Sequence, residues 1–98
     1  PDNVLEFAVK LTAKTRPNTD MAASITNEYL SWGAGPRASQ FLVVGAKCHA
    51  VLNGKYSPDI EDVKAIAPAI LRHRIVKNFK AEAEGISVED IIQNLLKD

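Results

Sequence analysis

The chain has 98 residues, and its 12 lysines and arginines are balanced by 12 aspartates and glutamates. This length allows one domain with one hydrophobic core, and an apolar content of 46% excludes a disordered chain. The net charge of zero argues against a dedicated DNA or RNA binder, because such proteins carry a basic surplus. We find no apolar run of the ~20 residues that a membrane span needs, no signal-peptide pattern and one cysteine. We therefore expect a cytoplasmic protein without membrane insertion.

The first predicted helix spans residues 3–15. Asp2 or Asn3 can cap it, and Asn3 with Glu6 forms a pair that is typical of a capping box. Apolar residues follow at helical spacing: Val4, Phe7, Ala8 and Leu11. Pro17 ends the helix, because the residue before a proline is disfavoured in the helical conformation.

Residues 17–32 have the weakest pattern in the chain. They open with turn-forming residues and close with Tyr29–Trp32, for which we expect a short extended stretch. We expect Trp32 to pack against the base of the following helix, as a core residue rather than a platform for a ligand.

Residues 33–52 form the stretch around which we expect the rest of the chain to be organised. Two glycines stop the chain, and Pro36 then takes the first helical position, where its missing N–H costs nothing. The helix that follows is apolar nearly all round, which predicts a central helix with the others packed about it. We therefore expect Phe41 and Val44 to be largely buried and Cys48 to be a buried small hydrophobe.

Arg37 is an unusual residue for the first turn of this helix, where the helix dipole is positive and a cation is unfavourable. Free backbone N–H groups and a guanidinium at one spot make a site for an anion, above all phosphate. The alternative is an arginine that is solvated or paired with a carboxylate. The pattern alone leaves both open.

The next helix is predicted to start at Ser57-Pro58-Asp59, with Ser57 as the N-cap. Its inward face is expected to consist of Ile60, Val63, Ala67 and Ile70. Pro68 should kink or break this helix near Ala67, because it lacks an N–H and clashes with the preceding turn.

The last third of the chain predicts a strand and a helix. Residues 75–79 are expected to be extended and to pair with Tyr29–Trp32 as a two-stranded ribbon. A final helix follows Gly85, with Ser87 as its N-cap and Asp90 completing a capping box. The fold class is therefore mostly α, a small bundle of about four helices around a central apolar helix, with a short ribbon.

Four blocks of sequence occur in a characteristic order: residues 33–39 (GAGPRAS), 56–63 (YSPDIEDV), 67–74 (APAILRHR) and 83–87 (AEGIS). From Gly33 to the end, this order resembles the small C-terminal lid domain of MoxR-type AAA+ ATPases. Magnesium-chelatase-type ATPase subunits have a similar lid. The family's usual Gly-Ala-Ser-Pro-Arg reads Gly-Ala-Gly-Pro-Arg here, a departure at Gly35 that keeps the arginine.

The resemblance implies that Arg37 is the sensor-2 arginine, which reaches from the lid to the phosphates of bound ATP, with Gly35 and Pro36 beside it. It implies that ATP and Mg²⁺ are bound mainly by a preceding core domain, and that lid movement is coupled to hydrolysis in a chaperone-like or regulatory assembly. The partners implied are the AAA+ core of the same chain, a ring-shaped homo-oligomer and a von Willebrand factor A-type protein. Whether Arg37 acts on its own subunit's nucleotide or a neighbour's stays open.

The residues that cleave ATP are missing from this sequence. Gly54-Lys55 is followed by Tyr56 instead of the serine or threonine of a phosphate-binding loop, and no paired acids for Mg²⁺ are present. We therefore expect one domain of a longer ATPase that is not an enzyme alone. A start at Pro1 fits a piece of a longer protein, although removal of an initiator methionine would look the same.

Three alternatives have less support from the residues. A small helical DNA-binding domain needs a basic helix face, and a protein-interaction module without nucleotide contact is opposed only by the Gly-Pro-Arg block. An enzyme built on Cys48 and His49 is disfavoured, because neighbouring helix residues point about 100° apart. Nothing supports a metal site, since His49 has no partner at ligand spacing, and the roles of His73 and Arg74 stay open.

Overall fold

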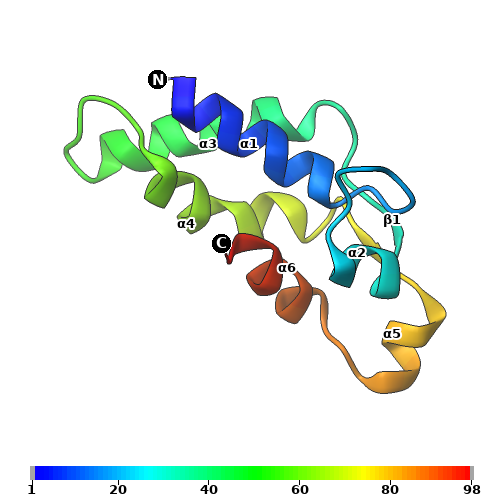
Figure 1. The fold of residues 1–98 in the computed structure, drawn as a ribbon. Helices are drawn as coiled ribbons and strands as arrows, with labels where there is room; N and C mark the ends of the chain where they lie inside the picture. The colour runs from blue at the N-terminus through cyan, green and yellow to red at the C-terminus, as the bar shows by residue number, and fades with distance from the viewer. Residues whose placement is uncertain (1, 98) are drawn as a thin grey trace.

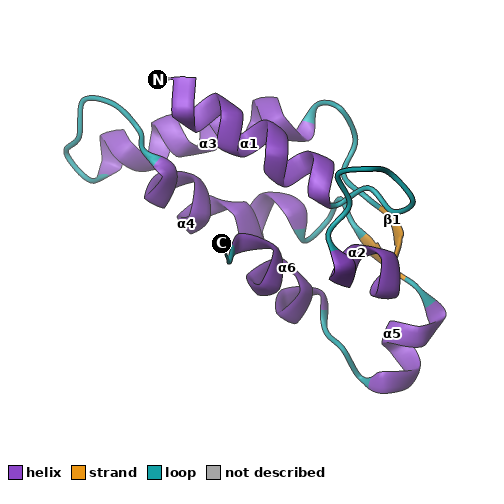
Figure 2. Ribbon diagram, in the orientation of Figure 1, coloured by secondary structure: helices purple, strands orange, loops and turns teal. Residues whose placement is uncertain are grey.

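The computed structural model describes residues 2–97, and these form six helices and a two-stranded antiparallel ribbon (Figures 1 and 2). In chain order the elements are α1 (Asp2–Lys14), α2 (Ser24–Tyr29), β1 (Leu30–Trp32), α3 (Ala38–Leu52), α4 (Ile60–Leu71), β2 (Val76–Lys77), α5 (Phe79–Glu84) and α6 (Val88–Leu96). The predicted mostly helical fold is confirmed. No helix in this part of the chain has the length and apolarity needed to cross a membrane.

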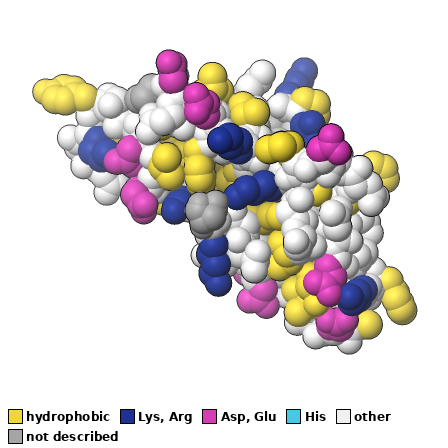
Figure 3. All heavy atoms as spheres, in the orientation of Figure 1, with side chains coloured by type: hydrophobic (Ala, Val, Ile, Leu, Met, Phe, Trp, Pro, Cys, Tyr) yellow, Lys and Arg dark blue, Asp and Glu magenta, His cyan; other side chains and the backbone are white. Residues whose placement is uncertain are grey.

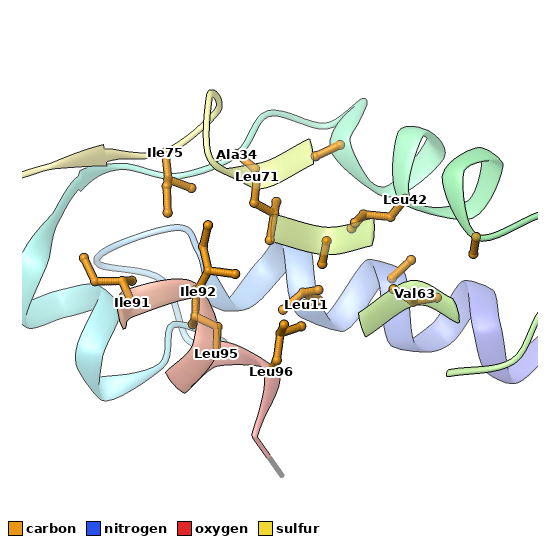
Figure 4. Close-up of a cluster of buried hydrophobic side chains, with 14 of the residues drawn as sticks. Leu11, Ala34, Leu42, Val63, Leu71, Ile75, Ile91, Ile92, Leu95 and Leu96 are labelled. Carbon is orange, nitrogen blue, oxygen red and sulfur yellow. The ribbon is translucent and has the colours of Figure 1, made fainter. Parts of the chain in front are cut away.

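The three longest helices, α1, α3 and α4, pack against one another, and α6 closes the group from the side of α4 (Figure 1). The short helices α2 and α5 lie with the ribbon at the other end, which makes the molecule elongated, about 43 × 25 × 22 Å. Between the two ends, side chains from α1, α3, α4 and α6 converge in one core (Figure 4): Leu11, Leu42, Val63, Leu71, Ile91, Ile92 and Leu95.

The predicted ribbon is confirmed. Leu30 pairs with Lys77 and Trp32 with Val76, with an irregular register between the two pairs. The amide of Asn78 donates to the Tyr29 carbonyl oxygen at 2.8 Å, which extends the connection beyond the strands. The ribbon therefore ties the segment before α3 to the segment after α4.

Two short helices, α2 and α5, were not predicted. Asn78 is the N-cap of α5, since its side chain accepts a hydrogen bond from the Ala81 amide, and Gly85 is the C-cap, in the left-handed conformation. α2 has no side-chain cap at Ala23, so its sequence carries no start signal. Thr26 of α2 instead donates its hydroxyl to the Lys14 carbonyl at the end of α1, a contact from outside the helix.

The expected burial of the central helix is wrong for one of its faces. α3 buries a narrow stripe of small residues together with one leucine: Ala38, Leu42, Ala46 and Ala50. Phe41 is 44% exposed and Val44 57% exposed, and Cys48 on the same side is exposed too. The stripe faces inward because small side chains let α3 approach α4 closely. A Cβ added at Gly45 would come within 3.0 Å of the Ile70 side chain.

Trp32 is 70% exposed, so the expectation that it packs against the base of α3 is also wrong. Its strand runs along the surface, where the partner residue Val76 is exposed as well. Only Leu30 of this strand is buried. Regular alternation would place Leu30 and Trp32 on the same face, but the register between these two residues is irregular, and Trp32 is exposed.

The start of α4 and the effect of Pro68 differ from prediction. Asp59, two residues after Ser57, is the N-cap, because it forms a reciprocal capping box with Asp62. The helix then continues through Pro68 to Leu71, so the proline costs one backbone hydrogen bond without ending the helix. α3 likewise begins at Ala38, two residues after the predicted first position at Pro36.

The orientation of α3 predicts that truncating two nearby side chains lowers the stability by very different amounts. Leu42→Ala should lower the free energy of unfolding by about 3 kcal/mol, because it leaves a cavity in the core. Val44→Ala, two residues away on the exposed face, should cost under about 1 kcal/mol. Chemical denaturation of the two variants measures both, and equal losses would mean that Val44 is also part of the core.

Candidate functional site

The segment from Gly33 to Arg37 joins β1 to α3 and is held against the end of α1. The Ala34 amide donates to the Thr15 hydroxyl oxygen at 2.9 Å, and the Arg16 Nε–H donates to the Ala34 carbonyl at 3.2 Å. Thr15 is fully buried, and its own hydroxyl donates to the Thr12 carbonyl at 2.6 Å. Both hydrogen-bonding capacities of this buried hydroxyl are thus used, and the segment has a defined position.

Gly33 is required here by close backbone approach. A Cβ at this position would lie 2.1 Å from the Thr15 carbonyl oxygen and 2.8 Å from the Arg16 Cα. Gly35 has no such constraint, since an added Cβ would have nothing within 4 Å and its φ is not positive. The two glycines of this segment therefore have different roles. Gly33 is needed for the close approach, whereas the backbone at Gly35 has room for the serine that is usual in the family.

Arg37 is placed at the N-cap of α3 and is exposed. Among residues 2–97, none forms a hydrogen bond or an ion pair with its guanidinium, so the carboxylate-paired alternative does not describe this arginine. The Ala38 amide donates a hydrogen bond to the Gly35 carbonyl oxygen at 3.0 Å, in the turn that precedes the helix. The guanidinium therefore stands free at the positive end of a 15-residue helix.

A surface hollow of about 420 Å³ lies at this end of α3 and is lined by Gly35, Pro36, Arg37, Ala38 and Arg74. The three predicted site residues are thus brought together. Arg74 was not predicted to join them, and only its place in the basic block before the second strand marked it. Two arginines are among the residues that line this hollow and no carboxylate is, a composition that suits an anion.

A family model for the AAA lid domain matches residues 22–95 of the chain. The chain belongs to this family. The predicted resemblance to MoxR-type lids is confirmed by the relatives of this lid. It is 29% identical over 94 residues to the chaperone MoxR1 of Mycobacterium tuberculosis, which is 96% of the chain and 25% of that protein. It is 33% identical over 54 residues to the magnesium-chelatase subunit ChlI of Guillardia theta, which is 15% of that protein.

The fold of the lid is also found in a solved structure. A protein from Cytophaga hutchinsonii described as an ATPase matches with a TM-score of 0.88 and 34% identity, over 98% of this lid and 29% of that chain. The lid also matches the uncharacterized protein YeaC of Bacillus subtilis at 27% identity, over 97% of the lid and 27% of that protein. The chain thus spans about a quarter of the length of MoxR1 and YeaC.

A second polar cluster closes the turn between α3 and α4, at the end opposite Arg37. The buried carboxylate of Asp62 contacts the His49 Nδ1 at 2.7 Å and accepts from the Lys55 ammonium at 2.6 Å and from the Asp59 amide at 2.9 Å. The Lys55 ammonium, then His49 and the backbone of Asp59, hold the pKa of Asp62 well below its ordinary value of 3.8. His49 thus has a structural partner and is not paired with the exposed Cys48.

The rest of the basic block differs in its partners. The Arg72 guanidinium forms a two-pronged ion pair with Glu89 of α6, at 2.7 and 3.3 Å, whereas His73 is exposed. Within residues 2–97, no three histidine, cysteine, aspartate or glutamate side chains gather as a metal site. Arg74 is therefore the residue of this block that joins Arg37.

The two glycines of the segment before α3 provide a matched test of how this segment is held. Gly33→Ala should lower stability by about 2 kcal/mol or more, because the new Cβ collides with backbone that cannot retreat. Gly35→Ala, and Gly35→Ser with the residue usual in the family, should stay within about 0.5 kcal/mol of the natural chain. Thermal or denaturant unfolding reports the difference, and a tolerated Gly33→Ala would contradict the close approach.

The Asp62 cluster predicts a dependence of stability on acid. Because the folded pKa of Asp62 lies below its unfolded value, its contribution is present above about pH 4 and is lost as the pH falls through the folded pKa. Asp62→Asn should be less stable than the natural chain at pH 7 and should lose less stability on acidification. Denaturant titrations between pH 7 and pH 2 measure this. An equal loss of stability on acidification in Asp62→Asn and in the natural chain would contradict this role of Asp62.

Proposed function

We propose that this lid works in an AAA+ ATPase, where Arg37 is the sensor-2 arginine that contacts the phosphates of bound ATP and couples hydrolysis to lid movement. The observation that carries the proposal is the unpartnered, exposed guanidinium of Arg37 on a hollow at the start of α3. A cation at this end of a helix opposes the helix dipole, so it does not stabilise the fold. Its charge becomes favourable when an anion binds beside it.

The segment that carries Arg37 supports this role. It is held by Thr15 and Arg16 at the end of α1, so movement of the lid would move the arginine with it. A residue that reports on nucleotide must be coupled to the body that moves, and a mobile loop would lose this coupling. The side chain is free while its backbone is fixed, which is the combination that such a sensor needs.

The remaining parts of the proposal come from the resemblance. ATP and Mg²⁺ would be bound mainly by a core domain of the same chain, in a cytoplasmic ring-shaped homo-oligomer with a chaperone-like or regulatory task. A von Willebrand factor A-type protein is the proposed partner. The exposed apolar side of α3, with Phe41, Val44, Val51 and Leu52, favours a lid that meets another protein surface.

The DNA-binding alternative loses support from the same helix. An exposed face of α3 that entered a major groove should be basic, but this one is mostly apolar, with Lys47 as its exposed lysine. On the face of the molecule drawn in Figure 3, dark-blue and magenta side chains are interspersed, and no continuous basic stripe crosses it. The charges of this face do not form the footprint of a nucleic-acid binder.

The test is to measure stability and turnover on one variant. Arg37→Ala should change the stability of the chain by no more than about 0.5 kcal/mol, because no contact of the fold is lost. In the whole ATPase it should lower the rate of ATP hydrolysis per folded subunit, because a charge-assisted contact to phosphate is lost. Lys10→Ala, which removes an exposed cation from α1, is the control and should leave turnover unchanged. Clear destabilisation with normal turnover would remove Arg37 from the nucleotide site.

Mixed rings distinguish the two ways in which Arg37 could act. Subunits with Arg37→Ala are combined with subunits that carry a disabled phosphate-binding loop in the core domain. Recovery of activity in the mixture would place Arg37 on a neighbour's nucleotide, whereas independent loss would place it on its own.

A further inference from the structure

Arg37 and Arg74 both line the hollow at the start of α3, and they come from different parts of the chain. Arg74 follows α4, whereas Arg37 precedes α3. The two arginines line the same hollow because α3 and α4 run antiparallel, which brings the start of one helix beside the end of the other (Figure 1). Neighbouring Arg72 is neutralised by Glu89, but no carboxylate pairs with Arg74 among residues 2–97.

Arg74 is held in place by two contacts that leave its charge uncompensated. Its Cζ lies 4.6 Å from the centre of the Phe41 ring, and one Nη1–H donates to the Ile70 carbonyl at 2.9 Å. A cation on an aromatic face keeps its full charge, and its remaining N–H groups stay available to an anion. An arginine fixed before binding loses less side-chain freedom than a free one when the anion arrives.

The same contact explains why an aromatic residue stands on the exposed side of α3. Phe41 is only partly covered, and its guanidinium neighbour lies over the ring. Phe41 is 44% exposed, and part of its ring is covered by the Arg74 guanidinium. This contact can fix the position of the arginine on the surface.

We propose that Arg74 is a second phosphate-binding residue of the lid, and that it holds the triphosphate of the nucleotide together with Arg37 from a position set by Phe41. The inference rests on the proposed function, since it takes the anion of the hollow to be the nucleotide. Two arginines that line one hollow suit the adjacent phosphate groups of ATP better than a single phosphate. In this pair the guanidinium of Arg74 is held by Phe41 and the Ile70 carbonyl, whereas that of Arg37 has no hydrogen bond or ion pair among residues 2–97.

The experiment compares nucleotide affinities of the whole ATPase and its variants by equilibrium binding of ATP, ADP and AMP. Arg74→Ala should weaken ATP binding by about tenfold, because a charge-assisted contact is lost, and should change AMP binding by less than about twofold. Arg72→Ala, two residues away and engaged with Glu89, is the matched control and should leave the ATP-to-AMP affinity ratio unchanged. Arg74→Lys, which keeps the charge without the fork, should fall between the natural protein and Arg74→Ala.

Phe41→Leu gives a second route that keeps the guanidinium and the apolar bulk. It should weaken ATP binding by about threefold in the natural protein and not at all in the Arg74→Ala background, since it acts through the arginine. Equal effects in both backgrounds would show that Phe41 does not position Arg74.

The outcomes separate this inference from the proposed function. If Arg37→Ala weakens ATP binding and Arg74→Ala leaves the ATP-to-AMP ratio unchanged, the second contact is overturned and the sensor role stands. If both variants keep the natural ratio, both proposals fail. A ratio lowered by Arg74→Ala with an unchanged melting temperature supports the contact.

Discussion

The close approach of α3 to α4 is the constraint on which the rest of this lid depends. The inner stripe of α3 is made of alanines and one leucine, and a Cβ added at Gly45 would lie 3.0 Å from the Ile70 side chain and 3.1 Å from that of Ile66. Small residues at such a contact let two helices pack at short range along their whole length. Because the pair is antiparallel, this packing also decides which residues meet at its two ends.

Charged side chains are paired at one end of the α3–α4 pair and have no carboxylate partner among residues 2–97 at the other. At the closed end, the turn between α3 and α4 buries the Asp62 carboxylate and satisfies it with Lys55, His49 and a backbone amide. At the open end, Arg37 has no partner within residues 2–97, and Arg74 rests on an aromatic ring instead of a carboxylate. A buried charge must be compensated inside the domain, whereas an exposed charge is solvated by water and stays available to a ligand. The polar chemistry of the closed end is therefore structural, and the open end is where binding is proposed.

The apolar outer face of α3 follows from the same packing. A helix that is apolar nearly all round can bury only the faces that its neighbours cover, and here α1 and α4 leave Val44, Val51 and Leu52 exposed. An exposed apolar stripe of this kind is expected where a domain meets the rest of a larger protein. The lid spans about a quarter of MoxR1 and YeaC, so such a contact fits the proposed role.

Local chemistry was determined by the sequence alone. The capping box of Ser87 and Asp90 starts α6, the period of its apolar residues places that helix on the core, and Arg37 stood out because a helix start is the wrong place for a cation. Each of these depends only on residues a few positions apart. The tertiary structure alone decided which of two apolar faces of α3 is buried, and it exposed Trp32 on the ribbon. Only the antiparallel packing of α3 on α4 could bring Arg74 beside Arg37, because residues distant in the sequence meet through packing that no local pattern encodes.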